Sequence, residues 1–283
     1  MFYPSLMPHE SIMSEQIFSL AALTVLELSP PQMVEAAARA GYSHVGLRLE
    51  PATAEEYHFP LVADLGLRRQ TAKALSDTGI KVLDIEILRL KPATDVRAFE
   101  VFLEVGAEFG ATELLIAGND PDEARLTEHF ALLCDLAKPY GIYPHLEFMP
   151  WTDTPDLSKA LRIVENADRS NGCVLVDAFH FNRSRSSLDQ LAAAVREKPY
   201  RFRYTQMCDV VGPVPDHMDE ILRQARNERR FPGDGDCDLQ GLLQALPRHV
   251  PISIEAPTRE QPPLDGFERA AAGLKKMREV LAR

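Results

Sequence analysis

The sequence predicts a single-domain α/β protein, a (β/α)8 barrel, and two observations support this fold. Apolar runs rich in β-branched residues alternate with helical patterns along the whole chain, which is typical of strand–helix–strand units on a parallel sheet. A chain of 283 residues with 45% hydrophobic content can bury one sizeable core, and barrels of this type commonly reach this length as one domain. We therefore expect residues 17–283 to form the barrel and residues 1–16 to form a loosely attached arm.

Eight short apolar runs are the predicted strands, and three helices between them are predicted to begin at a capping residue followed by proline, which is tolerated in a first turn. The capping pairs are Ser29-Pro30, Asp120-Pro121 and Thr154-Pro155. The first two have Gln32 and Glu123 at capping-box spacing. The strands are expected near residues 17–22, 44–49, 81–87, 112–118, 143–147, 173–177, 202–206 and 251–255.

One strand–helix unit is longer than the others. Between Asp209 and Leu239 the chain carries a polar and basic helix around residues 219–230, followed by the turn-rich sequence Pro232-Gly233-Asp234-Gly235. A long loop on the catalytic face of a barrel often covers a substrate. We expect this insertion to do so.

Composition and charge exclude several classes of protein. The formal net charge of −11 argues against a nucleic-acid partner, because binding to phosphates usually needs a clustered basic surface. The apolar stretch at residues 17–26 is interrupted by polar residues and follows acidic ones, so it predicts neither a signal peptide nor a membrane span. The cysteines lack metal-type spacing and predict free thiols in a reducing cytoplasm; they are Cys134, Cys173, Cys208 and Cys237.

Four polar residues follow the last four predicted strands, at intervals of 30, 29 and 49 residues: Glu147, Asp177, Gln206 and Glu255. About 30 residues is the length of one strand–helix unit, so these side chains should converge at one mouth of the barrel. Three carboxylates and an amide oxygen suit a hard divalent cation such as Mg²⁺ or Mn²⁺. Each residue taken alone is equally consistent with an ordinary solvated acid or strand end, so the prediction depends on the four together.

Further candidates lie around this mouth. His180 forms an Asp-x-x-His step with Asp177, placing an imidazole just beyond a strand end. Three further residues are candidates for substrate binding. Glu86 and Arg48 lie near the ends of the third and second predicted strands, where Glu86 could contact substrate and Arg48 could bind an anion, and Arg183 follows His180 in the sixth loop. For the last three, a rim salt bridge is an equally good interpretation.

These residues resemble a known group, the xylose isomerase-like TIM barrels of the sugar phosphate isomerase/epimerase superfamily. The resemblance covers residues 17–282, and it is the combination of motifs that is specific to the superfamily. The motifs are Leu146-Glu147, Asp177-Ala178-Phe179-His180, Gln206, Arg230 with Pro232-Gly233-Asp234-Gly235, and Ile254-Glu255.

The resemblance implies one divalent metal ion, Mn²⁺ or Mg²⁺ first and Co²⁺ or Zn²⁺ next, held by Glu147, Asp177, Gln206 and Glu255. It also implies that Glu147 and Glu255 transfer protons on opposite faces of the substrate. His180 would hydrogen-bond a substrate oxygen, and Arg230 would bind a hydroxyl or anionic group. The epimerases of the superfamily typically have histidine where this chain has Gln206, whereas glutamine occurs there in dehydratases.

We therefore expect a metal-dependent isomerase or epimerase of a small sugar or related polyhydroxy carbonyl compound, acting through a metal-stabilised enediolate. The alternative is a metal-dependent dehydratase acting on a keto-cyclitol such as inosose or on 3-dehydroshikimate. A DNA-repair nuclease on the same barrel conflicts with the acidic charge and the eight histidines. A barrel that binds a sugar without turnover remains open, and homo-oligomers are common among such barrels.

Overall fold

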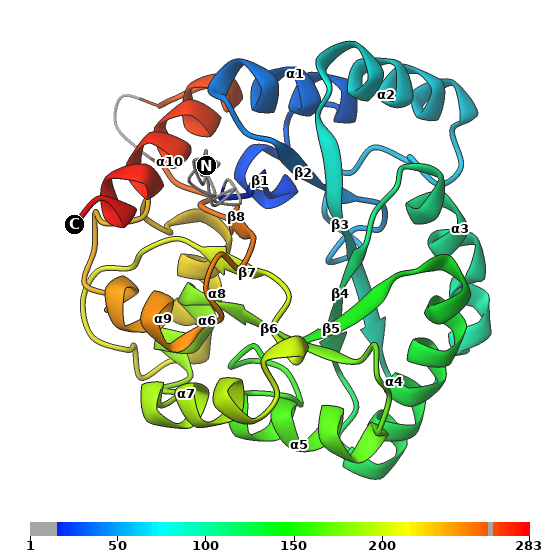
Figure 1. Ribbon diagram of the computed structural model, residues 1–283, viewed down its shortest axis with the longest axis vertical. Coiled ribbons are helices and arrows are strands. Elements are labelled where there is room, and N and C mark those ends of the chain that lie inside the picture. The colour runs from blue at the N-terminus through cyan, green and yellow to red at the C-terminus, as the bar shows by residue number, and fades with distance from the viewer. Residues whose placement is uncertain (1–15, 260–262) are drawn as a thin grey trace, which may run out of the picture.

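The protein is a closed barrel of parallel strands with helices packed around it, which confirms the predicted single-domain (β/α)8 barrel. The computed structural model describes residues 16–259 and 263–283. Within these residues the strands follow one another around the barrel in chain order, and the last pairs with the first (Figure 1). The predicted N-terminal arm lies outside the described residues except for Gln16, whose side chain donates a hydrogen bond to the carbonyl of Val250 at 2.8 Å.

Each predicted strand corresponds to a strand of the barrel, but three of them are short. In the described residues the strands are β1 (Phe18–Leu20), β2 (His44–Arg48), β3 (Lys81–Leu90), β4 (Glu113–Gly118), β5 (Tyr143–Glu147), β6 (Cys173–Asp177), β7 (Thr205–Met207) and β8 (Ile252–Ile254). β7 begins three residues later than predicted because a 3-10 turn carries the chain through Arg201. β3 runs three residues further than predicted, to Leu90.

The helices fill the intervals between the strands and form the outer ring in Figure 1. The α-helices of the described residues are α1 (Pro30–Ala40), α2 (Leu65–Thr78), α3 (Glu100–Glu108), α4 (Glu123–Ala137), α5 (Leu157–Ala167), α6 (Ala178–Arg183), α7 (Leu188–Glu197), α8 (Met218–Asn227), α9 (Leu239–Ala245) and α10 (Gly266–Leu281). The 3-10 helices are η1 (Ala22–Val25), η2 (Val96–Phe99), η3 (Lys138–Tyr140) and η4 (Pro199–Arg201). Their apolar faces pack on the barrel and form the main hydrophobic core.

One of the three predicted helix starts is correct. At α1 the side chain of Gln32 accepts a hydrogen bond from the Ser29 N–H at 3.0 Å, as the capping-box spacing predicts. The starts predicted at Asp120 and Thr154 are wrong by two residues, because Asp122 and Asp156 cap α4 and α5 with their side chains. In both loops the proline pair is followed by an aspartate, whose carboxylate is a strong acceptor for the free N–H groups of the first turn.

A buried polar cluster lies at the end of the barrel where the strands begin. The Glu113 carboxylate, at the start of β4, is 2.7 Å from Nε2 of His145 on β5. Arg203, which precedes β7, donates to both oxygens of Glu113, at 2.8 and 2.9 Å. The Arg203 guanidinium lies 3.6 Å from the ring centroid of Tyr143. This cluster therefore joins three parts of the barrel wall.

The Glu113 cluster is expected to make the fold sensitive to acid. Burial would raise the pKa of Glu113, but hydrogen bonds from His145 and Arg203 outweigh burial and lower the pKa from 4.5 to about 2. The ionised carboxylate therefore contributes stability above about pH 4.5, and this contribution is lost as the pH falls toward 2. Such a difference in pKa corresponds to about 3 kcal/mol.

Urea unfolding should show Glu113→Gln less stable than wild type by about 3 kcal/mol near neutral pH, with the gap narrowing as the pH falls from about 4.5 toward 2. Glu104→Gln, which changes an exposed acid on α3, is the control and should show no such gap. A gap for Glu113→Gln that stays constant over this pH range would contradict the assignment.

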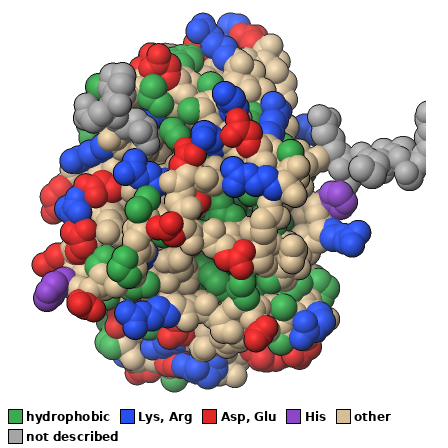
Figure 2. All heavy atoms as spheres, turned by 90° about the vertical axis from the view of Figure 1, so that its left-hand side faces the viewer, with side chains coloured by type: hydrophobic (Ala, Val, Ile, Leu, Met, Phe, Trp, Pro, Cys, Tyr) green, Lys and Arg blue, Asp and Glu red, His purple; other side chains and the backbone are tan. Residues whose placement is uncertain are grey.

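The surface carries charged side chains of both signs. Figure 2 shows one face, on which acidic and basic side chains are interspersed without a dominant basic patch. Among the described residues no helix is both long enough and apolar enough to cross a bilayer.

Candidate metal and active site

A small cavity lies at the mouth of the barrel where the strands end. Its volume is about 70 Å³. Charged and apolar side chains both line it; the lining comprises Leu23, Arg48, Ala52, Glu56, Glu86, Ile87, Arg89, Leu115, Glu147, Met149, Trp151, His180, Ala225, Arg226, Arg229 and Glu255. In parallel barrels of this kind the active site lies at this end.

Glu147 and Asp177 are held at the ends of adjacent strands. Glu147 is the last residue of β5 and Asp177 the last of β6, and both are buried. Asp177 also caps α6, because its Oδ1 accepts a hydrogen bond from the His180 N–H at 2.9 Å. By contrast, Oε1 of Glu147 is buried without a hydrogen-bond partner. The Asp177 carboxylate is thus fixed by a backbone hydrogen bond, whereas the Glu147 carboxylate retains an oxygen without a hydrogen-bond partner.

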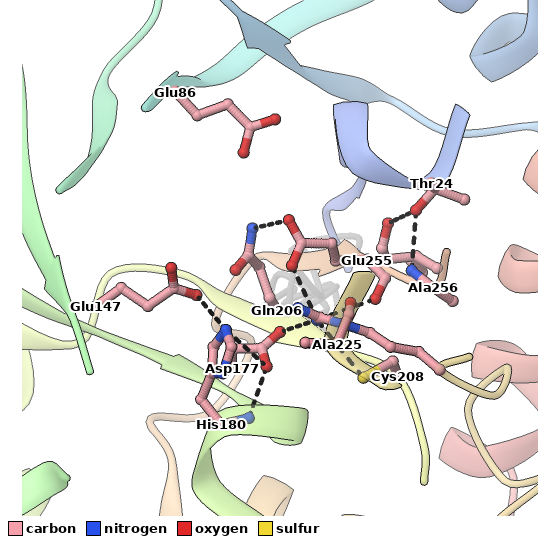
Figure 3. A network of polar contacts seen from close by, with 12 residues as sticks. Thr24, Glu86, Glu147, Asp177, His180, Gln206, Cys208, Ala225, Glu255 and Ala256 are labelled. Carbon is pink, nitrogen blue, oxygen red and sulfur yellow. Dashed lines mark hydrogen bonds and ion pairs between the residues drawn. The ribbon is translucent and has the colours of Figure 1, made fainter. Parts of the chain in front are cut away.

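Gln206 and Glu255 complete the predicted set of four. Gln206 lies in the middle of β7, opposite Asp177 in the pairing with β6. Its Nε2 donates to Oε1 of Glu255 at 3.1 Å, while its own Oε1 is buried without a partner. Glu255 follows β8 and is tied to β7 through its N–H, which donates to the carbonyl of Met207 at 3.1 Å. Figure 3 shows Glu86, Glu147, Gln206 and Glu255 extending from different sides toward a common space.

His180 was predicted to hydrogen-bond a substrate oxygen, and the structure places it beside two acids of the site. Its Nε2 lies 3.6 Å from Oε1 of Glu147 and 3.9 Å from Oδ1 of Asp177 (Figure 3). Ligand atoms of these three residues all lie within 4.8 Å of one another, so the group can hold a metal ion. Burial lowers the pKa of His180 to about 3, which leaves its imidazole neutral and able to act as a ligand.

Arg229 is a buried residue of the site that the sequence prediction missed. Its side chain is fully buried, and its Nη1 lies 2.8 Å from Oδ2 of Asp177 and 2.9 Å from Oε2 of Glu255. Its Nε donates to the carbonyl of Ala225 at 2.9 Å, which fixes the guanidinium to α8. The prediction chose the neighbouring Arg230, which is exposed and whose backbone forms a β-bridge with Asp209. Successive residues in extended chain point to opposite sides, so only one of the pair can face the barrel.

The site carries more negative than positive charge. Three buried carboxylates surround the single guanidinium of Arg229; they are Glu147, Asp177 and Glu255. Burial raises the pKa of Glu147 well above 4.5, and the charges of Glu255 and Asp177 raise it further. Burial also raises the pKa of Glu255 to about 7, although Arg229 opposes this. When all three acids are ionised, two negative charges are left uncompensated by Arg229, and these charges together with the unpartnered oxygens of Glu147 and Gln206 fit a divalent cation.

The remaining predicted residues divide between two places. Glu86 and Arg48 line the cavity and contact each other, with Arg48 Nε 3.3 Å from Glu86 Oε1, while Oε2 of Glu86 has no partner. Arg48 also donates to both oxygens of Glu56. Arg183 and Arg230 instead line a separate cavity of about 210 Å³ on the other side of α8. There Arg183 donates to Gln224 and to the carbonyls of residues 211 and 212.

The long insertion lies against the site, as the sequence predicts. Its helix α8 contributes Ala225 and Arg226 to the cavity wall, and Arg229 follows directly after it. The turn at Pro232-Gly233-Asp234-Gly235 is held by Asp209, whose Oδ2 accepts from the Gly233 N–H at 3.0 Å. The insertion thus supplies the buried cation of the site.

A closed parallel barrel with acids, an amide and an imidazole at its carboxyl-terminal mouth has the architecture of a TIM-barrel enzyme with a polar-substrate site. Residues 34–279 match the sequence model of the xylose isomerase-like TIM barrel family. The chain belongs to this family, which confirms the resemblance inferred from its motifs.

Curated relatives of the chain are enzymes with different activities. Inosose isomerase of Bacillus subtilis (strain 168) is 31% identical over 116 residues, which are 40% of this chain and 38% of that protein. 3-dehydroshikimate dehydratase of Pseudomonas putida (strain KT2440) is 27% identical over 259 residues, which are 81% of this chain and 38% of that protein. The chain therefore spans about two fifths of the length of these relatives.

Solved structures share the fold at low sequence identity. The IOLI protein with a binding zinc atom has a TM-score of 0.76 at 21% identity, covering 94% of this chain and 98% of that chain. D-allulose 3-epimerase from Methylomonas sp. in complex with D-allulose has a TM-score of 0.66 at 18% identity, covering 93% and 96%. At sequence identities this low, the similarity shows a shared fold and does not show a shared activity.

Proposed function

We propose that this protein is a divalent-metal-dependent isomerase or epimerase of a small sugar or related polyhydroxy carbonyl compound. The observation that carries the proposal is the pair of buried carboxylates, Glu147 and Glu255: burial raises the pKa of Glu147 well above 4.5 and that of Glu255 to about 7. A group that exchanges a proton near neutral pH is suited to general acid–base catalysis. The two extend into one cavity from opposite sides of the barrel mouth (Figure 3).

The metal ligands of the proposed site are Glu147, Asp177, Gln206 and Glu255, with His180 as a further candidate. Gln206 suits this role because its amide nitrogen donates to Glu255, which leaves the amide oxygen without a partner. A bound dication would supply positive charge beside the oxygens of a substrate enediolate. Which divalent ion is bound remains part of the proposal, with Mn²⁺ or Mg²⁺ first.

Glu147 would remove the proton from the carbon next to the substrate carbonyl, and Glu255 would return one on the opposite face. Arg229 holds Glu255 and Asp177 in place through Nη1 and supplies a fixed positive charge beside the reacting atoms. His180, neutral and buried against Trp151 at a ring-centroid distance of 5.0 Å, can donate one hydrogen bond to a substrate oxygen. Glu86 offers its free Oε2 to a substrate hydroxyl.

A dehydratase is the second candidate, and two observations favour it. The third proposed ligand is Gln206, not histidine. The 3-dehydroshikimate dehydratases of Pseudomonas putida and Pseudomonas aeruginosa (strain PAO1) match 81% and 89% of this chain at 27% and 26% identity. On such a substrate the same proton removal would be followed by loss of a β-hydroxyl group in place of reprotonation.

Proton exchange in D₂O distinguishes these reactions. Protein stripped with a chelator and reloaded with Mn²⁺ should place solvent deuterium on the carbon next to the carbonyl of a ketose or keto-cyclitol, and the stripped protein should not. Formation of an ultraviolet-absorbing enone or diene would identify the dehydratase. If metal removal changes only thermal stability and no polyhydroxy carbonyl compound ever gives deuterium uptake or an enone, the barrel binds its ligand without turnover and the proposal is wrong.

A further inference from the structure

Two of the four arginines that line the catalytic cavity have no acidic partner in the described residues. Arg48 contacts Glu86 and Glu56, and Arg229 contacts Asp177 and Glu255, so both of these guanidinium groups are neutralised by carboxylates. Their positive charges serve to hold the acids of the site. The other two arginines differ in this respect; they are Arg89 and Arg226.

Arg89 is half-buried yet bonded only to neutral acceptors. Its Nε donates to the carbonyl of Ala52 at 2.9 Å and its Nη1 to Oδ1 of Asn119 at 3.0 Å. These contacts fix the direction of the side chain without neutralising it. Burial lowers the pKa of Arg89; the nearby Glu147 opposes this effect, and the positive charges of Arg48 and Arg226 add to it. Holding an uncompensated cation here is unfavourable unless an anion arrives to pair with it.

Arg226 lies on α8 and reaches the same cavity from the insertion. Its side chain is exposed and makes no ion pair with any acid that the structure describes. Arg89 and Arg226 therefore come from separate parts of the chain, β3 and α8, and both line the cavity of about 70 Å³. Two guanidinium groups arranged in this way can bind the oxygens of one carboxylate or phosphate.

Space for the charged end of a substrate lies beside these residues. A groove of about 520 Å³ borders the cavity, and Ala52, Ile87 and Arg89 line both. Lys91 also lines this groove, together with the acids Glu50 and Asp95. A molecule with its carbonyl at Glu147 and Glu255 can therefore extend toward Arg89 without crossing the barrel wall.

We propose that Arg89 and Arg226 bind an anionic group, a carboxylate or a phosphate, on the substrate, so that the site selects acidic over neutral polyhydroxy carbonyl compounds. This inference rests on the proposed function and names the class of substrate for it. Arg89 is oriented by its carbonyl contacts, and Arg226 closes on the anion from α8. The arginines named from the sequence as candidates for substrate binding lie elsewhere: Arg48 is paired with carboxylates, and Arg183 and Arg230 line a separate cavity.

Calorimetric binding to the Mn²⁺-loaded protein tests the proposal with two matched pairs of probes. One pair is 3-dehydroshikimate and its methyl ester, and the other is D-fructose 6-phosphate and D-fructose. The charged member of at least one pair should bind about tenfold more tightly than its neutral counterpart, because a charge-assisted hydrogen bond contributes at least this factor. A preference within the first pair alone assigns a carboxylate, and within the second alone a phosphate.

Arg226→Gln and Arg89→Gln should each abolish most of this preference, because each should weaken the binding of the charged probe much more than that of the neutral one. Arg226→Gln is the safer variant, because its side chain makes no hydrogen bond within the described residues and its loss should not disturb folding. Arg196→Gln, an exposed arginine on α7 outside the cavity, is the matched control and should keep the preference. If the charged probes bind no more tightly than the neutral ones, or if the preference survives in both variants, the proposal is wrong.

The same samples, transferred to D₂O, separate this inference from the proposed function. A charge preference without metal-dependent deuterium uptake or enone formation would keep the anion site and overturn the enzyme proposal. Deuterium uptake by neutral compounds, with no charge preference in binding, would support the enzyme proposal and overturn the anion site.

Discussion

Glu147→Gln is expected to lower metal-dependent deuterium exchange by about 10² to 10⁴-fold, because an amide cannot accept the substrate proton. The same change should weaken Mn²⁺ binding from about one ion per chain, since a neutral amide replaces a carboxylate ligand. Stability should respond in the opposite direction. Glu147 is buried and its pKa is raised well above 4.5 by burial and by neighbouring acids, so its replacement relieves charge repulsion in the metal-free fold. We expect an equal or higher free energy of unfolding for the metal-free variant.

Lower exchange and weaker metal binding, together with equal or higher stability, would show that Glu147 has a functional role and that the variant has not misfolded. Glu128→Gln, which changes an exposed acid on α4, is the control and should leave exchange, metal binding and stability unchanged. Exchange and metal binding at the wild-type level in Glu147→Gln would show that the carboxylate has neither proposed role.

Arg229→Met is expected to destabilise the metal-free protein by about 3 kcal/mol, because it leaves two buried acids without their shared cation. Those acids are Asp177 and Glu255, whose oxygens contact the Arg229 guanidinium at 2.8 and 2.9 Å. The variant also loses the bond from Arg229 to the carbonyl of Ala225, so the end of α8 should exchange its amide hydrogens faster. Urea unfolding and hydrogen exchange measure the two effects.

Mn²⁺ should restore part of the stability lost in Arg229→Met, because a cation bound only by the folded state stabilises it by about 2.7 kcal/mol at a hundredfold excess over its dissociation constant. Arg230→Met is the matched control. Its side chain is exposed, and contacts of exposed charges contribute only about 0–1 kcal/mol. Equal losses in the two variants would mean that the burial of Arg229 between the acids has no energetic importance.

The barrel was predictable from sequence because each strand–helix unit repeats the same local pattern. Apolar runs, short loops and one capping box all point to a parallel barrel, and the structure confirms it. The errors lie where two local signals compete. Proline pairs at Asp120 and Thr154 resemble helix starts, but an aspartate two residues later forms the cap in each case.

The part of the site that is formed by residues at strand ends was predictable from the sequence. Two intervals of about 30 residues and one lengthened by the insertion indicated that Glu147, Asp177, Gln206 and Glu255 would converge, and the structure brings them to one mouth. Arg89 was missed because β3 continues past its predicted end, through a register shift between Ile85 and Leu88 that no residue pattern announces. Arg229 was missed because it lies in a loop, where the orientation of a side chain depends on pairing with distant residues.

The β-bridge between Asp209 and Arg230 has a consequence for aligning this chain with distant homologues. The bridge fixes which side of the chain each neighbouring side chain faces. The residue just before the bridged position therefore points into the barrel. Insertion or deletion of a single residue between α8 and the bridge would exchange the inward and outward arginines while leaving both in the sequence. In an alignment, the residues of this loop should therefore be matched by their distance in sequence from the bridged residue. Matching arginine with arginine can align a buried cation with an exposed one.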